Sequence, residues 1–299
     1  QVTVTASKVA TPLSEATRLV TVISAKEIAQ TPARSIQELL TYVAGIDVAQ
    51  RGAQGVQADI SIRGGSHDQT IILLNGINIS SSKTGHLSFD FPINLSDIER
   101  IEILRGPSAL IYGTGAFSGA INIITKHEAE KSLYAKVSAG MHRLTGAELR
   151  GALSLGKTQN SLSLSRRSSA GYQSNTDYEI YNALWQSRLM LSEANKMDLQ
   201  LGYSDKQFGA NSFYSPKYPN QYEHTRRAAA SLRGDLGSSH LRFLPTLYWD
   251  HEFDRFDLIK GSTVGQNHHI VNNYGAGLIM NYSSTLGTTT LAGELRFEE

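Results

Sequence analysis

The glycines near the end of the first half are spaced in a way that could form a phosphate-binding loop. Gly113, Gly115 and Gly119 stand in an order that loosely matches a dinucleotide-binding loop. Such a loop needs a strand before the glycines and a helix after them, so that the helix N-terminus meets the phosphate. The following segment, Ala120 to Thr125, has the composition of a strand. The sequence therefore argues against cofactor binding here.

Other catalytic and metal-binding patterns are weak or absent from the sequence. His67 and Asp68 adjoin in a loop without a second cluster at ligand spacing. The chain has no cysteine, which excludes disulfide scaffolds and cysteine-based zinc sites. Neither G-x-S-x-G nor H-E-x-x-H occurs. We therefore predict that the protein is not an enzyme and has no cofactor, apart from the calcium considered below.

Composition favours strands over helical bundles. The 299 residues include 26 glycines and 13 tyrosines, and only 18% of residues are charged. The net charge of +1 offers no electrostatic case for nucleic acid. No apolar run approaches the roughly 18 residues of a membrane-spanning helix. No signal peptide opens the chain, so for an exported protein we expect the signal to have been removed.

The first half predicts a small α/β domain. The pattern S-x-x-E recurs at Ser24, Ser35 and Ser96, and predicts helices through Ala29 and Tyr42 and one turn before the strand that begins near Arg100. The other expected strands are 46–48, 59–63, 70–74 and 77–79, the last two joined by the Asn75-Gly76 turn. Polar loops at 50–57, 64–69 and 80–89 could present side chains to a ligand.

From Leu133 onward the sequence alternates apolar and polar residues in nine segments. These are 133–139, 146–155, 161–168, 178–191, 197–206, 227–236, 241–253, 271–282 and 288–298. Short turns, such as 156–160 and 237–239, alternate with longer loops at 169–177, 209–226 and 259–270. Short turns at one end and long loops at the other are typical of an outer-membrane barrel.

A soluble β-sandwich also uses alternating strands, but two features favour the barrel. The segments approach the roughly 9–11 residues that cross a membrane obliquely. Many also carry aromatics suited to an interfacial girdle, namely Tyr172, Tyr178, Tyr181, Trp185, Tyr203, Phe208, Tyr248, Trp249, Tyr274 and Tyr282. A plugged barrel needs about 22 strands, so we expect this chain to be part of a longer protein.

Motifs in both halves resemble the TonB-dependent outer-membrane receptors. They are VTVTA at 2–6, IQELLTYVAGIDV at 36–48, ISIRGG at 60–65, IILLNGINI at 71–79 and IERIEILRGPSALIYGTGAFSGAINIITK at 98–126. The resemblance implies a mainly β protein whose N-terminal α/β plug domain lies inside a transmembrane antiparallel β-barrel. Residues 1–10 would be the TonB box and linker, 11–126 the plug, and 127–299 the first, incomplete part of the barrel.

Within the family, the chain resembles vitamin B12 (cobalamin) receptors. The segment FYSP at 213–216, continued by KYPNQYE at 217–223, is similar to receptors of the Bacteroidetes type. The resemblance implies TonB-dependent import of cobalamin across the outer membrane of a Gram-negative bacterium. Its implied partners are TonB at the periplasmic face, membrane lipid and, in some receptors, a surface lipoprotein cap. Alternatives are a ferric-siderophore or haem receptor, an adhesin or docking barrel without uptake, and a soluble β-rich binding protein.

The resemblance also implies site residues. For substrate we expect Arg51, Gln54 and Gln57 in one plug loop, Ser82, Lys83, Thr84 and His86 in a second, and Tyr214 in a barrel loop. These are mostly neutral hydrogen-bonding residues, which suits cobalamin with its amide groups better than an anionic ferric catecholate. TonB would bind Val2, Thr3, Val4, Thr5 and Ala6. Cobalamin receptors can carry calcium on loop carboxylates, for which Asp177, Glu179 and Asp205 are the candidates.

Two arginines resemble plug residues that pair with barrel carboxylates. They are Arg63, in IRG, and Arg105, in LRGP. Alternation places Glu294 and Glu298 on the face opposite Leu295 and therefore toward the barrel lumen. Because a buried arginine without a carboxylate is costly, we predict that Arg63 or Arg105 pairs with one of these glutamates.

Overall fold

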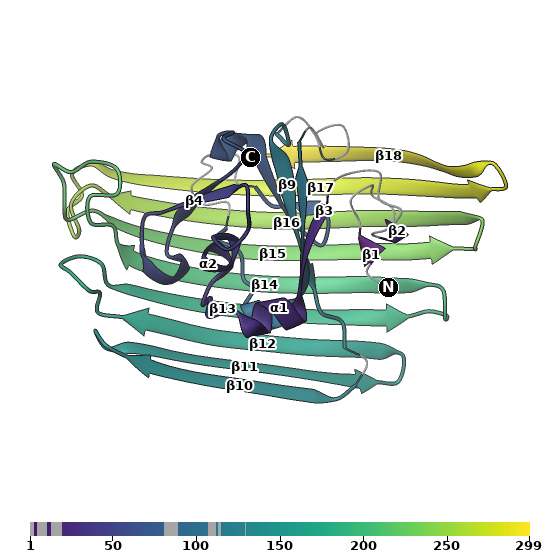
Figure 1. The fold of residues 1–299 in the computed structure, drawn as a ribbon, viewed down its shortest axis with the longest axis horizontal. Coiled ribbons are helices and arrows are strands. Elements are labelled where there is room, and N and C mark those ends of the chain that lie inside the picture. Colours follow the sequence, from purple (N-terminus) through teal and green to yellow (C-terminus); the bar gives the residue numbers. More distant parts are fainter. Residues whose placement is uncertain are drawn as a thin grey trace. The chain divides into compact units, whose positions relative to one another are not determined.

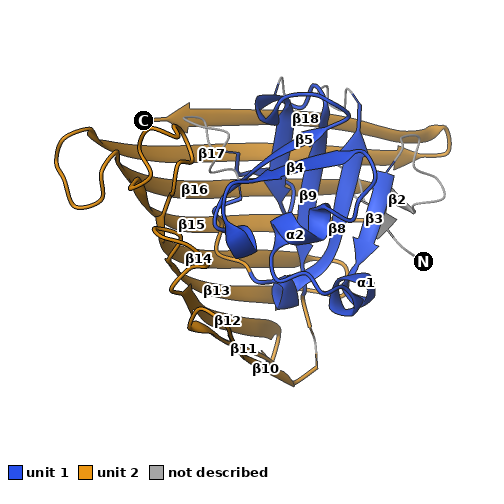
Figure 2. Ribbon diagram, turned by 60° about the vertical axis from the view of Figure 1, so that its left-hand side comes forward, with its two compact units in different colours: residues 1–90, 94–126 blue, residues 91–93, 127–299 orange. Residues whose placement is uncertain are grey.

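The computed structural model describes residues 3–4, 11–12, 20–80, 89–106, 112, 115–128 and 130–299. The chain divides into two compact units, coloured separately in Figure 2. The first comprises residues 1–90 and 94–126, and the second comprises residues 91–93 and 127–299. No helix in the described ranges is long and apolar enough to cross a membrane.

The first unit is built on a five-stranded mixed sheet with the order β3-β8-β9-β6-β7. Its strands are β3 (Val20–Ser24), β6 (Thr70–Leu74), β7 (Ile77–Asn78), β8 (Ile98–Arg105) and β9 (Gly119–Thr125). Strands β6 and β9 are parallel, and the other pairs are antiparallel. Ile101, Ile103, Leu104 and Ile121 are completely buried, so this sheet carries the core of the unit.

Two short helices begin at the predicted serines. Helix α1 (Ala25–Gln30) starts with a complete capping box between Ser24 and Glu27, which confirms the prediction. Helix α2 (Ile36–Leu40) is capped by Ser35, but it ends before Tyr42. The Glu38 carboxylate accepts instead from the backbone nitrogen of Arg34, at 2.8 Å.

The third predicted cap is wrong by two residues. The 3₁₀ turn at Leu95–Asp97 is capped by Asn94, which forms a reciprocal pair with Asp97. Ser96 lies inside the turn. The shorter Asn and Asp side chains make the same two local bonds that Ser and Glu were expected to make, so the S-x-x-E pattern alone could not choose between them.

Tight turns set the positions of the plug loops. Asn75 and Gly76 both have positive φ, 52° and 82°, as a two-residue hairpin turn between β6 and β7 requires. A separate hairpin pairs β4 (Ile46–Gln50) with β5 (Ala58–Ile62). It is followed by a turn in which Arg63 and Gly64 also have positive φ and the Gly65 nitrogen donates to the Ile62 carbonyl at 3.0 Å.

The second unit is one antiparallel sheet of nine strands in sequence order (Figure 1). The strands are β10 (Ser132–Gly140), β11 (Leu144–Leu155), β12 (Thr158–Ser169), β13 (Tyr178–Met190), β14 (Lys196–Gly209), β15 (Tyr222–Gly237), β16 (Leu241–Asp257), β17 (Gln266–Ser284) and β18 (Gly287–Glu298). Several are longer than predicted, because backbone pairing continues past the alternating segment; β15, for example, begins at Tyr222 opposite Asp257.

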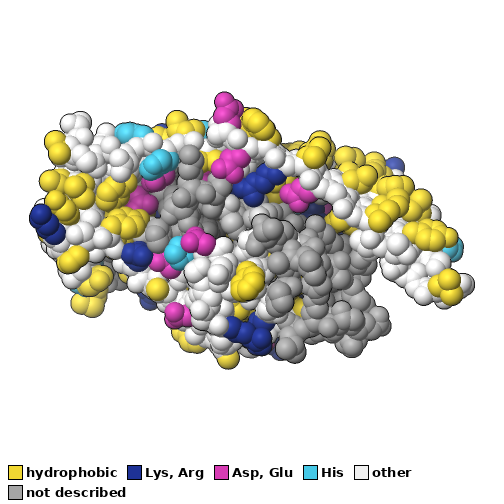
Figure 3. Space-filling view, turned by 90° about the horizontal axis from the view of Figure 1, so that it is seen from above, with side chains coloured by type: hydrophobic (Ala, Val, Ile, Leu, Met, Phe, Trp, Pro, Cys, Tyr) yellow, Lys and Arg dark blue, Asp and Glu magenta, His cyan; other side chains and the backbone are white. Residues whose placement is uncertain are grey.

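Register gives the sheet one polar face and one apolar face. One cross-strand row runs through Arg150, Ser163, Leu184, Gly202, Ala229, Asp250, Asn273 and Glu298. A neighbouring row on the opposite face runs through Leu162, Trp185, Leu201, Ala230, Trp249, Tyr274 and Phe297. Most side chains in the second row are large, apolar and exposed. Hydrophobic side chains along the unit are visible in Figure 3.

The predicted aromatic girdle is correct only for one set of residues. Tyr181, Trp185, Tyr203, Trp249 and Tyr274 lie on the apolar face. In contrast, Tyr178, Phe208 and Tyr248 belong to the polar face and are buried, so they do not contribute to a girdle. Proximity to the end of a strand does not decide which side an aromatic faces, because only its register does.

Candidate functional site

The β4–β5 hairpin presents the first predicted substrate loop. The loop closes through the Arg51 nitrogen, which donates to the Gln57 carbonyl at 3.0 Å. The Arg51 guanidinium donates to one carboxylate oxygen of Asp59, with distances of 2.8 Å from Nη2 and 3.2 Å from Nε. Gln54 has a positive φ of 55°, which turns the chain at the tip. Asp59, which sequence reasoning missed, therefore positions Arg51 and balances its charge.

The other predicted residues of the two plug loops are either buried or outside the described part of the chain. Gln57 is only 2% exposed, so in this conformation it supports the loop from inside instead of facing a ligand. Ser82, Lys83, Thr84 and His86 lie outside the described residues. The first loop therefore contributes Arg51 and Gln54 as its two half-buried polar candidates.

Tyr214 is held in place within its loop by contacts with three neighbouring residues. Its hydroxyl donates to Oε2 of Glu223 at 2.9 Å, and its ring meets Phe256 edge-on, with centroids 5.2 Å apart. Its backbone nitrogen donates to the side chain of Gln221 at 3.2 Å. Tyr214 remains 42% exposed, so it can still contact a ligand.

Three barrel loops are tied to one another by polar contacts. The Asn175 amide, in the loop 170–177, donates to the carbonyls of Pro219 and Gln221, at 3.0 and 2.6 Å. The Lys260 ammonium, in the loop 258–265, pairs with Asp177 at 3.0 Å. The backbone nitrogen of Lys260 also donates to the Asn220 carbonyl at 2.7 Å. These contacts organise the long-loop end of the sheet before any ligand arrives, and their long sequence separation hid them from sequence analysis.

The polar face of the sheet contains a buried ion pair that sequence reasoning also missed. Arg227 on β15 binds Asp250 on β16 through two nearly parallel bonds, 2.7 Å from Nε and 2.8 Å from Nη2. Their side chains are only 2% and 8% exposed. Such a fork is the strongest common pairing of these groups. The alternation of polar residues was the signal for the face, but it could not identify the pair.

The proposed plug–barrel lock residues have the following surroundings. Arg63 is exposed on its turn, and Arg105 donates from Nη2 to the Ala44 carbonyl at 2.7 Å. No acceptor in the described part of the chain reaches the buried Nε of Arg105. Glu294 and Glu298 share the face of Asp250, and Glu294 accepts from the Tyr248 hydroxyl at 3.1 Å. Pairing between these arginines and glutamates stays a prediction.

The expected TonB-binding segment is only partly described. Thr3 and Val4 form a short antiparallel ladder with Thr11 and Pro12. Val2, Thr5 and Ala6 lie outside the described residues. The backbone at positions 3 and 4 therefore adopts the extended conformation that strand addition requires.

Each calcium candidate has a cationic partner. Asp177 pairs with Lys260, Glu179 with Arg166 at 2.6 Å, and Asp205 with Arg226 at 3.1 Å. No group of three or more His, Asp or Glu side chains in the described ranges could hold a metal ion. Calcium would thus have to displace these cations, and its binding stays a prediction.

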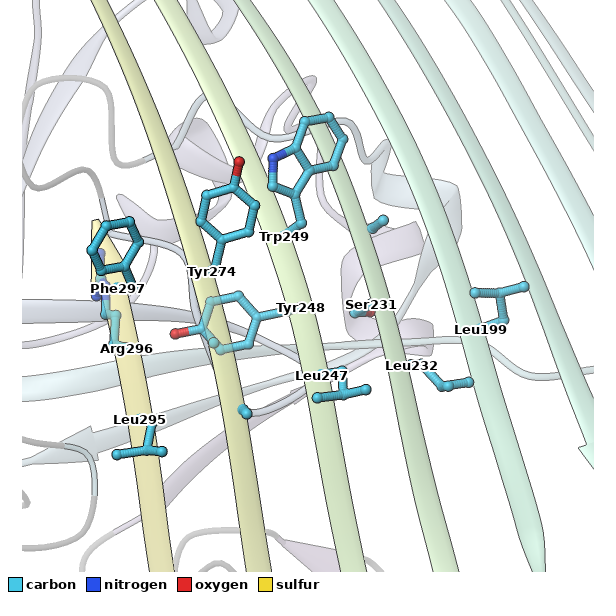
Figure 4. Close-up of a pocket in the computed structure, with 13 residues that line it drawn as sticks. Leu199, Ser231, Leu232, Leu247, Tyr248, Trp249, Tyr274, Leu295, Arg296 and Phe297 are labelled. Atoms are coloured by element: carbon cyan, nitrogen blue, oxygen red, sulfur yellow. The ribbon is translucent and has the colours of Figure 1, made fainter. Parts of the chain in front are cut away.

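A groove on the apolar face shows how the aromatic side chains are arranged (Figure 4). Trp249, Tyr274 and Phe297 lie side by side on β16, β17 and β18. Tyr274 and Phe297 have ring centroids 6.4 Å apart. The groove has a volume of about 590 Å³, and Leu247 and Leu295 extend it along the strands. Its exposed, mainly apolar lining suits contact with hydrocarbon.

Comparison with known proteins supports the resemblance to TonB-dependent receptors. Residues 12–120 match the TonB-dependent Receptor Plug Domain family. A Vitamin B12 transporter BtuB of Vibrio vulnificus is 40% identical over 140 residues, which are 46% of this chain and 22% of the relative. The BtuB of Vibrio cholerae is 36% identical over 174 residues, which are 57% of this chain and 28% of the relative.

A solved structure extends the likeness to the second unit. The copper transporter OprC superposes with a TM-score of 0.78 at 17% identity, covering 95% of this chain and 46% of that one. At this identity the likeness shows the fold alone. The chain thus spans less than half the length of the proteins that it matches. The plug motifs and the match over residues 12–120 identify a TonB-dependent receptor plug domain, and the chain as a whole resembles the TonB-dependent receptors in sequence and fold.

Proposed function

We propose that the receptor containing this chain imports cobalamin or a related corrinoid across the outer membrane of a Gram-negative bacterium. The similarity to proteins named vitamin B12 transporters supports this substrate class. The carrying observation is the ion pair of Arg51 with Asp59 at the tip of the β4–β5 hairpin. It lets Arg51 act as an oriented hydrogen-bond donor without adding net charge, which suits an uncharged, amide-rich ligand.

Energy for transport would come from TonB. Thr3 and Val4 supply extended backbone that TonB could capture as an added strand. Deleting Val2–Ala6 should abolish uptake while leaving ligand binding at the cell surface intact. If uptake survives the deletion, TonB engages another segment and this part of the proposal is wrong.

The lock residues belong to the same proposal. Arg63 or Arg105 would pair with Glu294 or Glu298 and hold the plug until TonB acts. Reversing one charge, as in Arg105→Glu, should increase uncoupled leakage of small solutes, and the second reversal Glu294→Arg should restore tightness. If neither Glu294→Arg nor Glu298→Arg restores tightness, these pairs are not part of the mechanism.

The deciding experiment is equilibrium binding of cyanocobalamin to the complete purified receptor in detergent, with a ferric catecholate tested in parallel. We expect cyanocobalamin to bind at submicromolar concentration and the ferric catecholate to bind weakly or not at all. The opposite order of affinities would identify a siderophore receptor. Binding of cyanocobalamin without TonB-dependent uptake would instead identify a docking barrel.

A further inference from the structure

A polar cavity lies on the outer, apolar-side surface of the sheet at its long-loop end. It has a volume of about 550 Å³. Its strand residues include Ser168, Glu179, Gln207 and Arg255, which stand in one cross-strand row. This row shares its face with Leu162, Leu164, Trp185 and Leu201, not with the buried polar residues such as Asp250. Most strand side chains of the cavity therefore lie on the apolar side, and the described substrate candidates Arg51, Gln54, Gln57 and Tyr214 do not line it.

Its position relative to the apolar band is set by register. Moving along the strands toward the long loops, the rows change from Trp185 and Leu201 to Tyr181 and Asp205, and then to Glu179 and Gln207. An apolar band that ends in aromatics and then gives way to charges marks the boundary between hydrocarbon and headgroups. The cavity thus lies at headgroup level, on the surface that surrounding lipid reaches.

The charges that line the cavity cancel. Its three cations, Arg166, Arg255 and Lys260, face three carboxylates, Glu179, Asp257 and Asp177. Every cation is paired, at 2.6 Å for Arg166–Glu179, 2.7 Å for Arg255–Asp257 and 3.0 Å for Lys260–Asp177. An anion would have to break one of these pairs and would gain no net attraction, so the lining does not favour a phosphate.

What remains is a dense set of donors and acceptors around an aromatic ring. The Tyr222 hydroxyl donates to Oε1 of Gln207 at 3.0 Å, and the Lys260 ammonium lies 5.3 Å from the Tyr222 ring centroid. Ser168 adds a hydroxyl. Asp257 is fully buried, and Gln266 also donates to it at 2.7 Å, so the base of the cavity is rigid. Alternating donors and acceptors on a preformed wall match the hydroxyls of a sugar.

We propose that this cavity binds the saccharide headgroup of a glycolipid in the surrounding outer leaflet, through uncharged sugar residues. The proposal rests on the outer-membrane location proposed above, but it does not depend on the transported substrate. A membrane-anchored ligand is favoured over a free glycan because the cavity opens beside the apolar band, where a lipid places its headgroup.

The test uses the complete receptor in detergent and a dephosphorylated, lipid-free core oligosaccharide from lipopolysaccharide, followed by titration calorimetry. We expect binding, and an affinity reduced about tenfold by Gln207→Ala and by Tyr222→Phe, since each removes a directional hydrogen bond. Gln200→Ala is the matched control, because Gln200 lies on the opposite face of the same strand, β14. It should leave the affinity unchanged.

Each alternative outcome is decisive. No binding, or an equal loss in all three variants, would overturn the proposal. Stronger binding of inorganic phosphate, with displacement of the oligosaccharide, would show an anion site instead. Tighter binding of a soluble maltooligosaccharide would favour a free glycan and would also count against the glycolipid. Cyanocobalamin binding measured on the same samples separates failure of this proposal from failure of the transport proposal.

Discussion

The phenol ring of Tyr248 lies across Gly275 on the neighbouring strand and places its hydroxyl 3.1 Å from Oε1 of Glu294, one strand farther on. A Cβ at position 275 would overlap the ring directly. Gly275 therefore provides the space through which one side chain links β16, β17 and β18. Figure 4 shows the ring of Tyr248. This contact sets Glu294, one of the predicted lock residues, in a defined position.

We predict that Gly275→Ala destabilises the receptor by about 1 to 3 kcal/mol, because the ring must move and lose its bond to Glu294. Gly277→Ala is the control, since a Cβ there would meet its nearest atom, the Gly293 carbonyl oxygen, at 3.7 Å. Urea unfolding of the receptor in detergent, followed by tryptophan fluorescence, measures both. Equal stability of the two variants would mean that the Tyr248 ring repacks without cost.

Removing one member of the buried Arg227–Asp250 pair should have a larger effect. Arg227→Gln leaves Asp250 buried without its cation, which typically costs about 3 to 5 kcal/mol. The matched control is Arg166→Gln, whose ion pair with Glu179 is half exposed and should contribute little. The same urea titrations test this prediction. If the two substitutions have equal effects, water reaches the Arg227 site far more than its burial indicates.

Stability should also depend on pH through His127, in the segment of the chain that connects β9 to β10. Burial, reinforced by the nearby Arg188, lowers the pKa of His127 from 6.5 to about 4. As the pH falls, His127 takes up a proton near pH 6.5 in the unfolded chain but only near pH 4 in the folded chain. The contribution of His127 to the free energy of unfolding is therefore fully present above pH 6.5 and is lost as the pH falls toward 4. The loss attributable to this group is about 3 kcal/mol.

The variant His127→Asn should therefore flatten the pH dependence of the unfolding free energy between pH 6.5 and 4. His240→Asn, at an exposed histidine in the turn before β16, should leave the curve unchanged. Urea midpoints measured at intervals across this range give the comparison. A wild-type curve that is already flat there would show that water reaches the half-buried His127 more freely than the lowered pKa implies.

Ligand affinity should depend on Arg51 and, more weakly, on Asp59. Arg51→Ala removes a charged donor and should weaken cyanocobalamin binding about tenfold. Asp59→Asn keeps the donor but loosens its orientation, so the loss should be smaller, and binding of a ferric catecholate should rise with the added net charge. Lys26→Ala, an exposed cation on α1, is the control. An unchanged affinity for Arg51→Ala would exclude this loop from the binding site.

Local sequence chemistry was enough to predict most elements. The Ser24 capping box, the Asn75-Gly76 turn and the nine alternating segments all appear in the structure at the expected places. Each depends on residues within a few positions of one another, so the sequence contains all the information that they need. The plug motifs added the family, which the comparison with known plug domains supports.

Contacts between distant residues could not be predicted in this way. The Arg227–Asp250 pair joins residues 23 positions apart, and Lys260 and Asp177 are 83 apart. Gln57 has a hydrogen-bonding side chain that could bind a ligand, yet the fold of its loop buries it. Tyr248 and Trp249 are adjacent in sequence, but they serve opposite faces of the sheet.

The sequence by itself determined the kind of protein: a plug of short elements followed by long alternating strands. Tertiary structure alone decided which polar groups are paired, which aromatics face outward and where cavities remain. The physical reason is that alternation specifies two faces of each strand, whereas register between strands specifies the neighbours of every side chain. Register is a property of the assembled sheet, and the proposed saccharide cavity exists only because of it.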